Sequence, residues 1–105
     1  MGGVEEELIS LKIDSSYYNK TNQNLIVDEN IIKLTQNEII TIEYFLDNKN
    51  KIVSSSDIFY EIWGFDKEYN PNSIRTLIKK IRKKLPLNMI ENIYGGSYRF
   101  IVWVY

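Results

Sequence analysis

The chain has 105 residues, of which 44% are hydrophobic, and a formal net charge of -1 at pH 7. A chain of this length can build one compact core and hardly two, so a single small domain is expected. The sequence contains neither Cys nor His, which excludes disulfides, thiolate zinc sites and the catalytic systems that depend on His. We therefore expect no metal, no cofactor and no enzymatic activity.

The first seven residues, MGGVEEE, are acidic where a signal peptide would be basic and then apolar. No segment approaches the 18 consecutive apolar residues of a membrane span. These features indicate a soluble, cytoplasmic protein. We expect residues 1–7 to be disordered or to derive from an expression vector, as in a piece of a longer chain, and residues 8–105 to form the folded domain.

Four short runs of β-favouring residues follow, over residues 8–13, 17–21, 24–28 and 30–34. Polar turn residues separate them, at 14–15, 22–23 and 29–30. Spacing this tight is typical of hairpins, in which neighbouring strands run antiparallel. The runs therefore predict an N-terminal antiparallel sheet of about four strands with one polar face.

The hydrophobic period becomes helical after residue 34. Thr35 and Glu38 have the spacing of a capping box, which predicts the start of a first helix that stops near Asn48. A short strand is expected over 51–54, because the segment KIVS separates this helix from the next apolar stripe.

A second helix is predicted to start after Ser55 or Ser56 as its N-cap and to run through Trp63. Gly64 ends it, since glycine suits the backbone conformation beyond a helix C-terminus. The following segment, GFDKEYNPN over 64–72, is rich in turn residues and is expected to be a loop.

A third helix is predicted with Ser73 as its N-cap, and it ends near Leu85 because Pro86 cannot continue it. Its apolar residues fall on one face at 100° per residue: Ile74, Leu77, Ile78, Ile81 and Leu85. Two strand-like runs on either side of Gly95 and Gly96 then predict a hairpin.

Positive charge is concentrated at this third helix. Residues 1–74 carry 6 Lys and Arg against 13 Asp and Glu, whereas residues 75–105 carry 7 against 1. Such an asymmetry creates a local field that attracts a polyanion whatever the net charge. For the helix alone, a merely solvated face explains the pattern equally well, because Lys and Arg are good helix formers near a C-terminus.

The second helix, the loop, the basic helix and the glycine-tipped hairpin together predict an α+β fold with a helix-turn-helix followed by a wing. Four segments resemble, in order and spacing, the C-terminal winged-helix DNA-binding effector domain of OmpR/PhoB-type response regulators: LTQNE, KIVSSSDIFYEIWG, NPNSIRTLIKKIRKKL and NIYGGSYRF. The resemblance implies sequence-specific binding of double-stranded DNA in transcription regulation, within a two-component phosphorelay. It also implies three partners: a receiver domain in the same protein, RNA polymerase, and a second copy bound head to tail on direct-repeat sites.

The resemblance further implies that the recognition helix, over about 73–85, lies in the major groove. The implied DNA contacts are Arg75, Thr76, Lys79, Lys80, Arg82, Lys83, Trp63, Asn72, Ser73, Tyr94 and Tyr98. Of these, Arg75, Thr76 and Lys80 would face base edges. The chemistry agrees, since an arginine can fork onto guanine and the methyl group of a threonine suits thymine.

The other implied contacts are made to the DNA backbone. Lys79 and Arg82 match residues that hold phosphates, and Lys83 extends the same basic side. The indole N–H of Trp63 and the hydroxyl of Tyr98 also fall where the family touches the backbone. A lysine is a flexible point charge, which suits phosphate better than a base edge.

The loop after the second helix occupies the place of the segment that contacts RNA polymerase in the family, which implies this role for Phe65, Asp66, Lys67, Glu68 and Tyr69. The wing departs from the family pattern. Tyr94 stands where many members carry an arginine that reaches the minor groove, and Ser97 replaces the usual glycine. Asn72 stands where a basic residue is frequent, which implies a neutral hydrogen bond in place of an ionic contact.

Two other functions fit parts of the sequence. A winged-helix domain can serve mainly for protein contact, with weak or no DNA binding, and the acid-rich residues 1–74 would then face protein partners. A carboxylate-based hydrolase would need a pair such as Asp57 and Glu61, which lie one helical turn apart. Such a pair is far more often a solvated surface feature.

Overall fold

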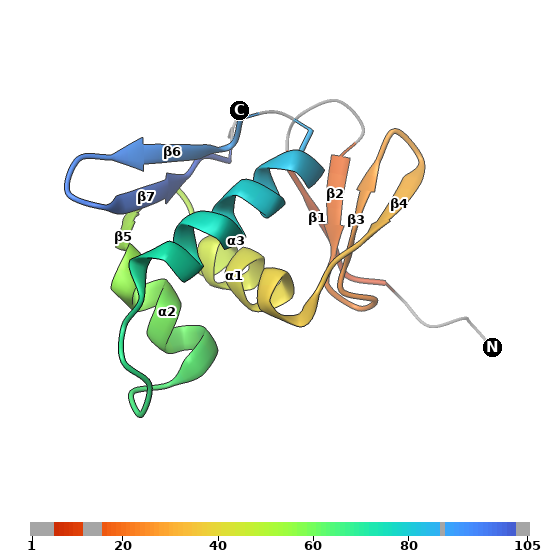
Figure 1. Ribbon diagram of the computed structural model, residues 1–105. Coiled ribbons are helices and arrows are strands. Elements are labelled where there is room, and N and C mark those ends of the chain that lie inside the picture. Colours follow the sequence, from red (N-terminus) through yellow and green to blue (C-terminus); the bar gives the residue numbers. More distant parts are fainter. Residues whose placement is uncertain (1–5, 12–15, 87, 103–105) are drawn as a thin grey trace.

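Two antiparallel sheets lie on either side of three helices (Figure 1). The computed structural model describes residues 6–11, 16–86 and 88–102. In chain order, its elements are β1 (Leu8–Ser10), β2 (Ser16–Asn19), β3 (Asn24–Val27), β4 (Asn30–Lys33), α1 (Gln36–Asp47), β5 (Ile52–Ser54), α2 (Ser55–Trp63), α3 (Pro71–Lys84), β6 (Ile90–Ile93) and β7 (Ser97–Phe100). The strand orders are β1-β2-β3-β4 and β5-β7-β6. The predicted α+β architecture, with a four-stranded sheet, three helices and a C-terminal hairpin as the wing, is confirmed.

The N-terminal sheet is built from tight hairpins, as the spacing of its sequence predicts. Asp28 and Glu29, in the turn between β3 and β4, have positive φ values of 50° and 70°, which short hairpin turns favour. Tyr18 on β2 pairs with Leu25 on β3, and both side chains are fully buried. The hydroxyl of Tyr18 donates to Glu43 of α1 at 2.6 Å, which ties the sheet to the helices. Burial and this carboxylate raise the pKa of Tyr18, so the hydroxyl remains a donor.

Two residues of the predicted N-terminal tail make hydrogen bonds to the first sheet and the turn that follows β2. β1 is shorter than the predicted first run, and residues 12–15 lie outside the described part of the chain. Glu6 and Glu7, expected to lie outside the fold, are both hydrogen-bonded. Asn19 donates to the Glu6 carboxylate at 2.9 Å, and the Glu7 N–H donates to the hydroxyl of Thr21 at 2.8 Å. The ordered domain therefore includes these two residues, while the rest of the predicted tail lies outside the described residues.

The start of α2 corrects the predicted N-cap. Ser54 fills this position in place of Ser55 or Ser56, and its hydroxyl accepts from the backbone N–H of Asp57 at 3.0 Å. Three consecutive serines have the same side chain, so the backbone conformation determines which of them becomes the N-cap. Ser54 has an extended backbone, with φ -81° and ψ 154°, which an N-cap requires.

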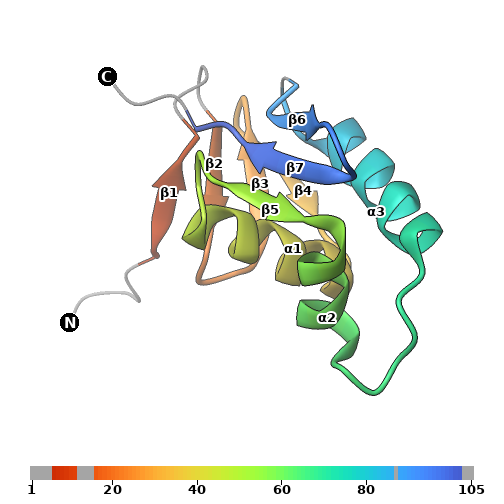
Figure 2. The ribbon, with the colours of Figure 1, turned by 90° about the vertical axis from the view of Figure 1, so that its left-hand side faces the viewer.

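The extended backbone of Ser54 comes from its place in the second sheet. Ser54 is the last residue of β5 and pairs with Ser97 of β7. The next residue, Ser55, donates its backbone N–H to the carbonyl of Gly96 at 3.1 Å. The wing hairpin is thus joined directly to the first residue of α2 (Figure 2).

α3 begins at Pro71, and its N-cap is Asn70 in place of the predicted Ser73. The side chain of Asn70 accepts from the N–H of Asn72 at 3.0 Å. Proline is favourable at the first helical position, because its φ already fits and its missing N–H has no intrahelical partner there. The helix ends at Lys84 with Leu85 as its C-cap, as predicted.

One face of α3 is buried in the core, and its burial follows the predicted apolar stripe. All five of these side chains are at most 7% exposed: Ile74, Leu77, Ile78, Ile81 and Leu85. Behind them, Phe45 of α1 stacks on Phe100 of β7 with ring centroids 5.3 Å apart. In Figure 2, α3 lies along one side of the molecule, away from β1, so its opposite face is turned outward. Within the described residues, no helix has the length and apolar character needed to cross a membrane.

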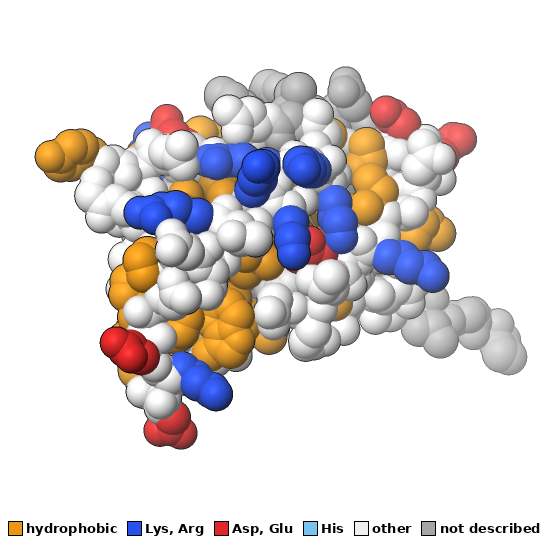
Figure 3. All heavy atoms as spheres, viewed as in Figure 1, with side chains coloured by type: hydrophobic (Ala, Val, Ile, Leu, Met, Phe, Trp, Pro, Cys, Tyr) orange, Lys and Arg blue, Asp and Glu red, His pale blue; other side chains and the backbone are white. Residues whose placement is uncertain are grey.

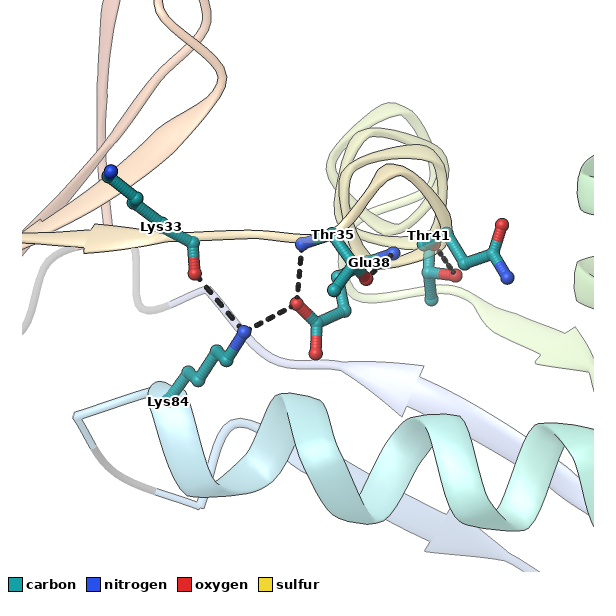
Figure 4. Close-up of polar contacts among 6 residues, drawn as sticks. Lys33, Thr35, Glu38, Thr41 and Lys84 are labelled. Atoms are coloured by element: carbon teal, nitrogen blue, oxygen red, sulfur yellow. Dashed lines mark hydrogen bonds and ion pairs between the residues drawn. The ribbon is translucent and has the colours of Figure 1, made fainter.

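A buried ion pair connects the end of α3 to the start of α1 (Figure 4). The predicted capping box of α1 is confirmed, since Thr35 and Glu38 each accept the other's backbone N–H. Lys84 Nζ lies 2.7 Å from Glu38 Oε1 and donates to the carbonyl of Lys33 at 3.1 Å. Burial alone would raise the pKa of Glu38, which is only 1% exposed, but the hydrogen bonds and charge of Lys84 and the bonds from Thr35 hold that pKa below its ordinary value.

We expect Lys84→Met to lower the free energy of unfolding by about 2 kcal/mol at pH 7, because it leaves a buried carboxylate without its charged donor. The folded pKa of Glu38 is depressed, so this stabilisation is complete above the ordinary pKa of 4.5 and is lost as the pH falls through the folded pKa. The difference between wild type and variant should therefore shrink below about pH 4. Urea unfolding measured by circular dichroism between about pH 3 and pH 7 tests this.

Lys83→Met is the matched control, because Lys83 carries the same charge on the same turn but is exposed. It should change the free energy of unfolding by less than about 0.5 kcal/mol. Equal losses in the two variants would show that the Lys84 contact contributes nothing particular.

Candidate nucleic-acid interface

Four cations of α3 point into solvent and form what we call the cationic face: Arg75, Lys79, Lys80 and Lys83. Figure 3 shows Lys and Arg side chains gathered across the middle of the molecule, over α3. The described residues contain three ion pairs, Lys20–Glu7, Lys84–Glu38 and Arg99–Glu91, and none of them involves the cationic face. Its charge is therefore not neutralised by carboxylates in the described part of the chain.

Repulsion among the charges of the cationic face costs much less free energy than burial of the opposite, apolar face of α3 contributes. α3 contains no acid, so no ion pair one turn away relieves the like charges, at a cost of a few tenths of a kcal/mol per pair. Each buried Ile or Leu on the opposite face contributes about 1.5–3 kcal/mol. Burial of the apolar face therefore fixes the rotation of α3 about its own axis, and the charge on the outer face remains available to an anionic partner.

At the start of α3, the residues predicted to face bases lie beside other predicted contacts. Arg75 Nη1 donates to Asn72 Oδ1 at 2.8 Å, which holds the guanidinium on the first turn. Thr76 and Lys80 line a hollow of about 540 Å³. The remaining lining residues of this hollow are Thr35, Asn37, Trp63, Asn70, Asn72, Ser73 and Leu77. The structure thus brings Trp63, Asn72, Ser73, Thr76 and Lys80 together.

On its other side, α3 faces the wing. Arg82 is half-buried, and its Nη2 donates to the carbonyl of Ile90 at 2.8 Å and to Asn92 Oδ1 at 2.9 Å. A second hollow of about 340 Å³ lies between α3 and the wing, lined by Arg75, Arg82, Asn92, Ser97, Tyr98 and their neighbours. Of the predicted DNA contacts, Arg82 is therefore the side chain with the most hydrogen bonds to other described residues. Nothing in the local sequence marks Asn92 as its partner.

Tyr98 is less accessible than the sequence suggests. Its side chain is 8% exposed and belongs to the hydrophobic core, although it also lines the hollow beside the wing. Burial raises the pKa of Tyr98, while the charges of Arg82 and Arg75 act in the opposite direction and lower it. The hydroxyl is therefore a neutral hydrogen-bond donor near neutral pH.

The tip of the wing carries a fully exposed aromatic ring. Tyr94 precedes Gly95 and Gly96, whose φ values of 91° and 78° give the tight turn that glycine permits. Tyr94 lines neither of the two hollows beside α3. The structure therefore separates it from the other predicted contacts.

The loop between α2 and α3 is fixed at one end and exposed at the other. Tyr69 is half-buried, and its hydroxyl donates to Ser55 Oγ at 2.8 Å. Phe65 is 86% exposed and stacks on Tyr60, with ring centroids 4.9 Å apart. Asp66, Lys67 and Glu68 between them are exposed. Tyr69 thus anchors the loop, and Tyr60 is a neighbour of the exposed ring that the sequence did not single out.

The carboxylates considered for hydrolysis are surface groups. Asp57 and Glu61 are both exposed on α2, where each is well solvated. In the described residues, no group of three or more potential acidic metal ligands comes together.

Comparison with known proteins gives consistent results. Residues 28–100 match the family described as "Transcriptional regulatory protein, C terminal". The chain is 33% identical over 89 residues to the transcriptional regulatory protein CssR of Bacillus subtilis, covering 83% of this chain and 40% of that protein. It is also 32% identical over 75 residues to the regulatory protein VanRB of Enterococcus faecalis, covering 71% of this chain and 34% of that one. The chain thus spans less than half the length of these relatives.

Solved structures share the same fold. The crystal structure of the DNA-binding domain of Bacillus subtilis CssR aligns with a TM-score of 0.75 and 29% identity, covering 82% of this chain and 99% of that chain. A Klebsiella pneumoniae RstA DNA-binding domain, solved in complex with the RstA box, aligns with a TM-score of 0.75 and 17% identity, covering 92% and 99%. At that lower identity, the second likeness concerns the fold alone.

We expect Tyr69→Phe to release the loop over residues 64–70, because it removes the hydroxyl that bonds to Ser55. The free energy of unfolding should fall by about 1 kcal/mol, the net contribution of one hydrogen bond. Amide hydrogen exchange should become faster in the loop and stay unchanged in β2 and β3. The control is Tyr94→Phe, which removes a fully exposed hydroxyl and should alter neither property. If the two variants showed the same protection of the loop from amide exchange, the hydrogen bond from Tyr69 to Ser55 would not anchor the loop.

Proposed function

The chain belongs to the family of C-terminal domains of transcriptional regulatory proteins, and from that membership we propose that it binds double-stranded DNA sequence-specifically, with α3 in the major groove. The observation that carries this proposal is the cationic face: four exposed cations with no carboxylate partner among the described residues. The helix that bears them follows α2 and precedes the wing, the order of a winged helix-turn-helix.

The chemistry of the cationic face favours a phosphate backbone as its partner. Each phosphate that a Lys or Arg neutralises releases counterions, which gives a salt-dependent gain in affinity. Lys79 and Lys83 are proposed to bind phosphates, because both are exposed and neither side chain is held by a hydrogen bond within the described residues. Trp63 and Tyr98 are proposed as further backbone contacts at the two hollows, whereas Arg82 is already bonded to Ile90 and Asn92 of the wing.

Base recognition is assigned to the N-terminal half of α3. Arg75 is held on the first turn by Asn72, and its planar guanidinium can bind guanine with two hydrogen bonds. Thr76 and Lys80 lie on the side of α3 that lines the larger hollow. Asn72 and Ser73 at the helix start, and Tyr94 at the wing tip, complete the proposed contacts.

The whole protein is proposed to be a two-component response regulator. The chain covers 40% of the CssR relative, so a receiver domain would account for much of the remaining length. Head-to-tail pairing on direct repeats and contact with RNA polymerase are proposed with it. The exposed Phe65 and the charged residues 66–68, on a loop anchored by Tyr69, are a suitable surface for the polymerase.

Protein contact in place of DNA binding is the second candidate. It is favoured by one observation, the exposed Phe65 ring at the surface of the α2–α3 loop. A domain of this kind would show no salt-dependent binding to any duplex, which separates it from the first proposal.

We expect Lys79→Ala and Arg75→Ala to affect DNA binding in different ways. Lys79→Ala should weaken binding to all duplexes alike and reduce the salt slope of log K by about 0.9, because one phosphate contact is lost. Arg75→Ala should remove about 1–3 kcal/mol of preference for the selected sequence over a random one, because a bidentate base contact is lost. Fluorescence anisotropy with selected and random duplexes across a salt series measures both quantities.

The charge-matched control is Lys49→Ala, an exposed lysine just beyond α1, which should change neither the slope nor the preference. Identical effects of Lys79→Ala and Arg75→Ala would contradict the division of roles. Failure of the wild type to bind any duplex at low salt would support the protein-contact function.

A further inference from the structure

Arg82 connects two elements that the proposed DNA contact must hold in register. Its Nη2 donates to the backbone carbonyl of Ile90 at 2.8 Å and to Asn92 Oδ1 at 2.9 Å. Ile90 and Asn92 both belong to β6, whereas Arg82 lies in the last turn of α3. One guanidinium nitrogen therefore joins the recognition helix to the wing.

Apart from Ile90, whose side chain is fully buried in the core, β6 has few other attachments to the helices. It is an edge strand, because the order of the second sheet is β5-β7-β6 and β6 pairs with β7 alone. The Arg99–Glu91 ion pair lies within the hairpin and cannot fix its angle to α3. Among the described residues, the two bonds from Arg82 are the hydrogen bonds between α3 and β6.

The contact is difficult to explain as a stabilising feature alone. Arg82 Nε is buried and has no hydrogen-bond partner among the described residues, and a buried donor without a partner is destabilising. An aliphatic side chain at this half-buried position would avoid that cost. A requirement for a fixed wing accounts for the arginine, since the two N–H groups of its rigid Nη2 reach two acceptors at once.

From this geometry we infer that Arg82 and Asn92 are positioning residues that fix the wing against the recognition helix, so that both walls of the hollow between them meet DNA at a set distance. The inference rests on the proposed DNA binding for its functional part. The hollow of about 340 Å³ has Arg75 on its α3 side and Ser97 and Tyr98 on its wing side. A loosened β6 would change the separation of these walls without changing the charge of the surface.

Two variants test this role while keeping the proposed cationic face intact. Arg82→Lys retains the positive charge but replaces the rigid guanidinium by an ammonium on a flexible stem, which holds the two acceptors less firmly. Asn92→Ala removes the side-chain acceptor and changes no charge. In the free domain, both should increase amide exchange in residues 90–93 by about tenfold, as expected for the loss of about one hydrogen bond. Asn92→Asp provides a matched control, because its carboxylate can still accept from Arg82, and exchange should stay close to wild type.

DNA binding then separates positioning from a simple phosphate contact. Arg82→Lys and Asn92→Ala should each lower affinity several-fold while leaving the salt slope of log K unchanged, because no phosphate contact is lost. Unchanged amide exchange in both variants would overturn the inference, as would wild-type affinity for Arg82→Lys together with a slope reduced by about 0.9 in Arg82→Ala. Because exchange is measured without DNA, faster exchange in a protein that binds no duplex would refute the proposed function and leave the structural link standing.

Discussion

The burial of one apolar stripe on α3 is the constraint on which the rest of the structure depends. Ile74, Leu77, Ile78 and Ile81 are almost completely buried, and together they contribute roughly 6–12 kcal/mol. This is comparable to the whole free energy of unfolding of a typical domain. Repulsion among exposed lysines is an order of magnitude smaller. Hydrophobic burial therefore sets the rotation of α3, and the concentration of charge on its outer face is a consequence.

The six cations of α3 have different structural roles because their surroundings differ. Lys84 is paired with the buried carboxylate of Glu38, and Arg82 is bonded to the carbonyl and side chain of two β6 residues. These two attach the C-terminal half of the helix to α1 and to the wing. The four cations of the cationic face remain free of ion pairs in the described residues. A count of charges along the sequence treats all six cations as equal. The fold separates them into two that make contacts within the domain and four that are exposed.

Features that depend on local sequence were predictable, and features that depend on distant partners were not. The order of strands and helices, the Thr35–Glu38 capping box and the apolar face of α3 all follow from short-range patterns. The N-cap of α2 did not, because pairing of Ser54 with Ser97 selects one serine among three. The Lys84–Glu38 pair joins residues 46 positions apart, and no pattern in a single sequence marks such a contact. For α3, the Asn70–Pro71 pair was a local signal that the choice of Ser73 overlooked.

The double role of Ser54 has a consequence for how such domains can vary. This residue ends a strand of the wing sheet and caps α2, and the next backbone N–H bonds to Gly96. An insertion between β5 and α2 would separate the cap from the strand and shift the helix that supports α3. Gly96 belongs to the tight turn at the hairpin tip, so extra residues there would disturb the same junction. Both the connection between β5 and α2 and the tip of the wing hairpin are therefore expected to keep their length in related domains.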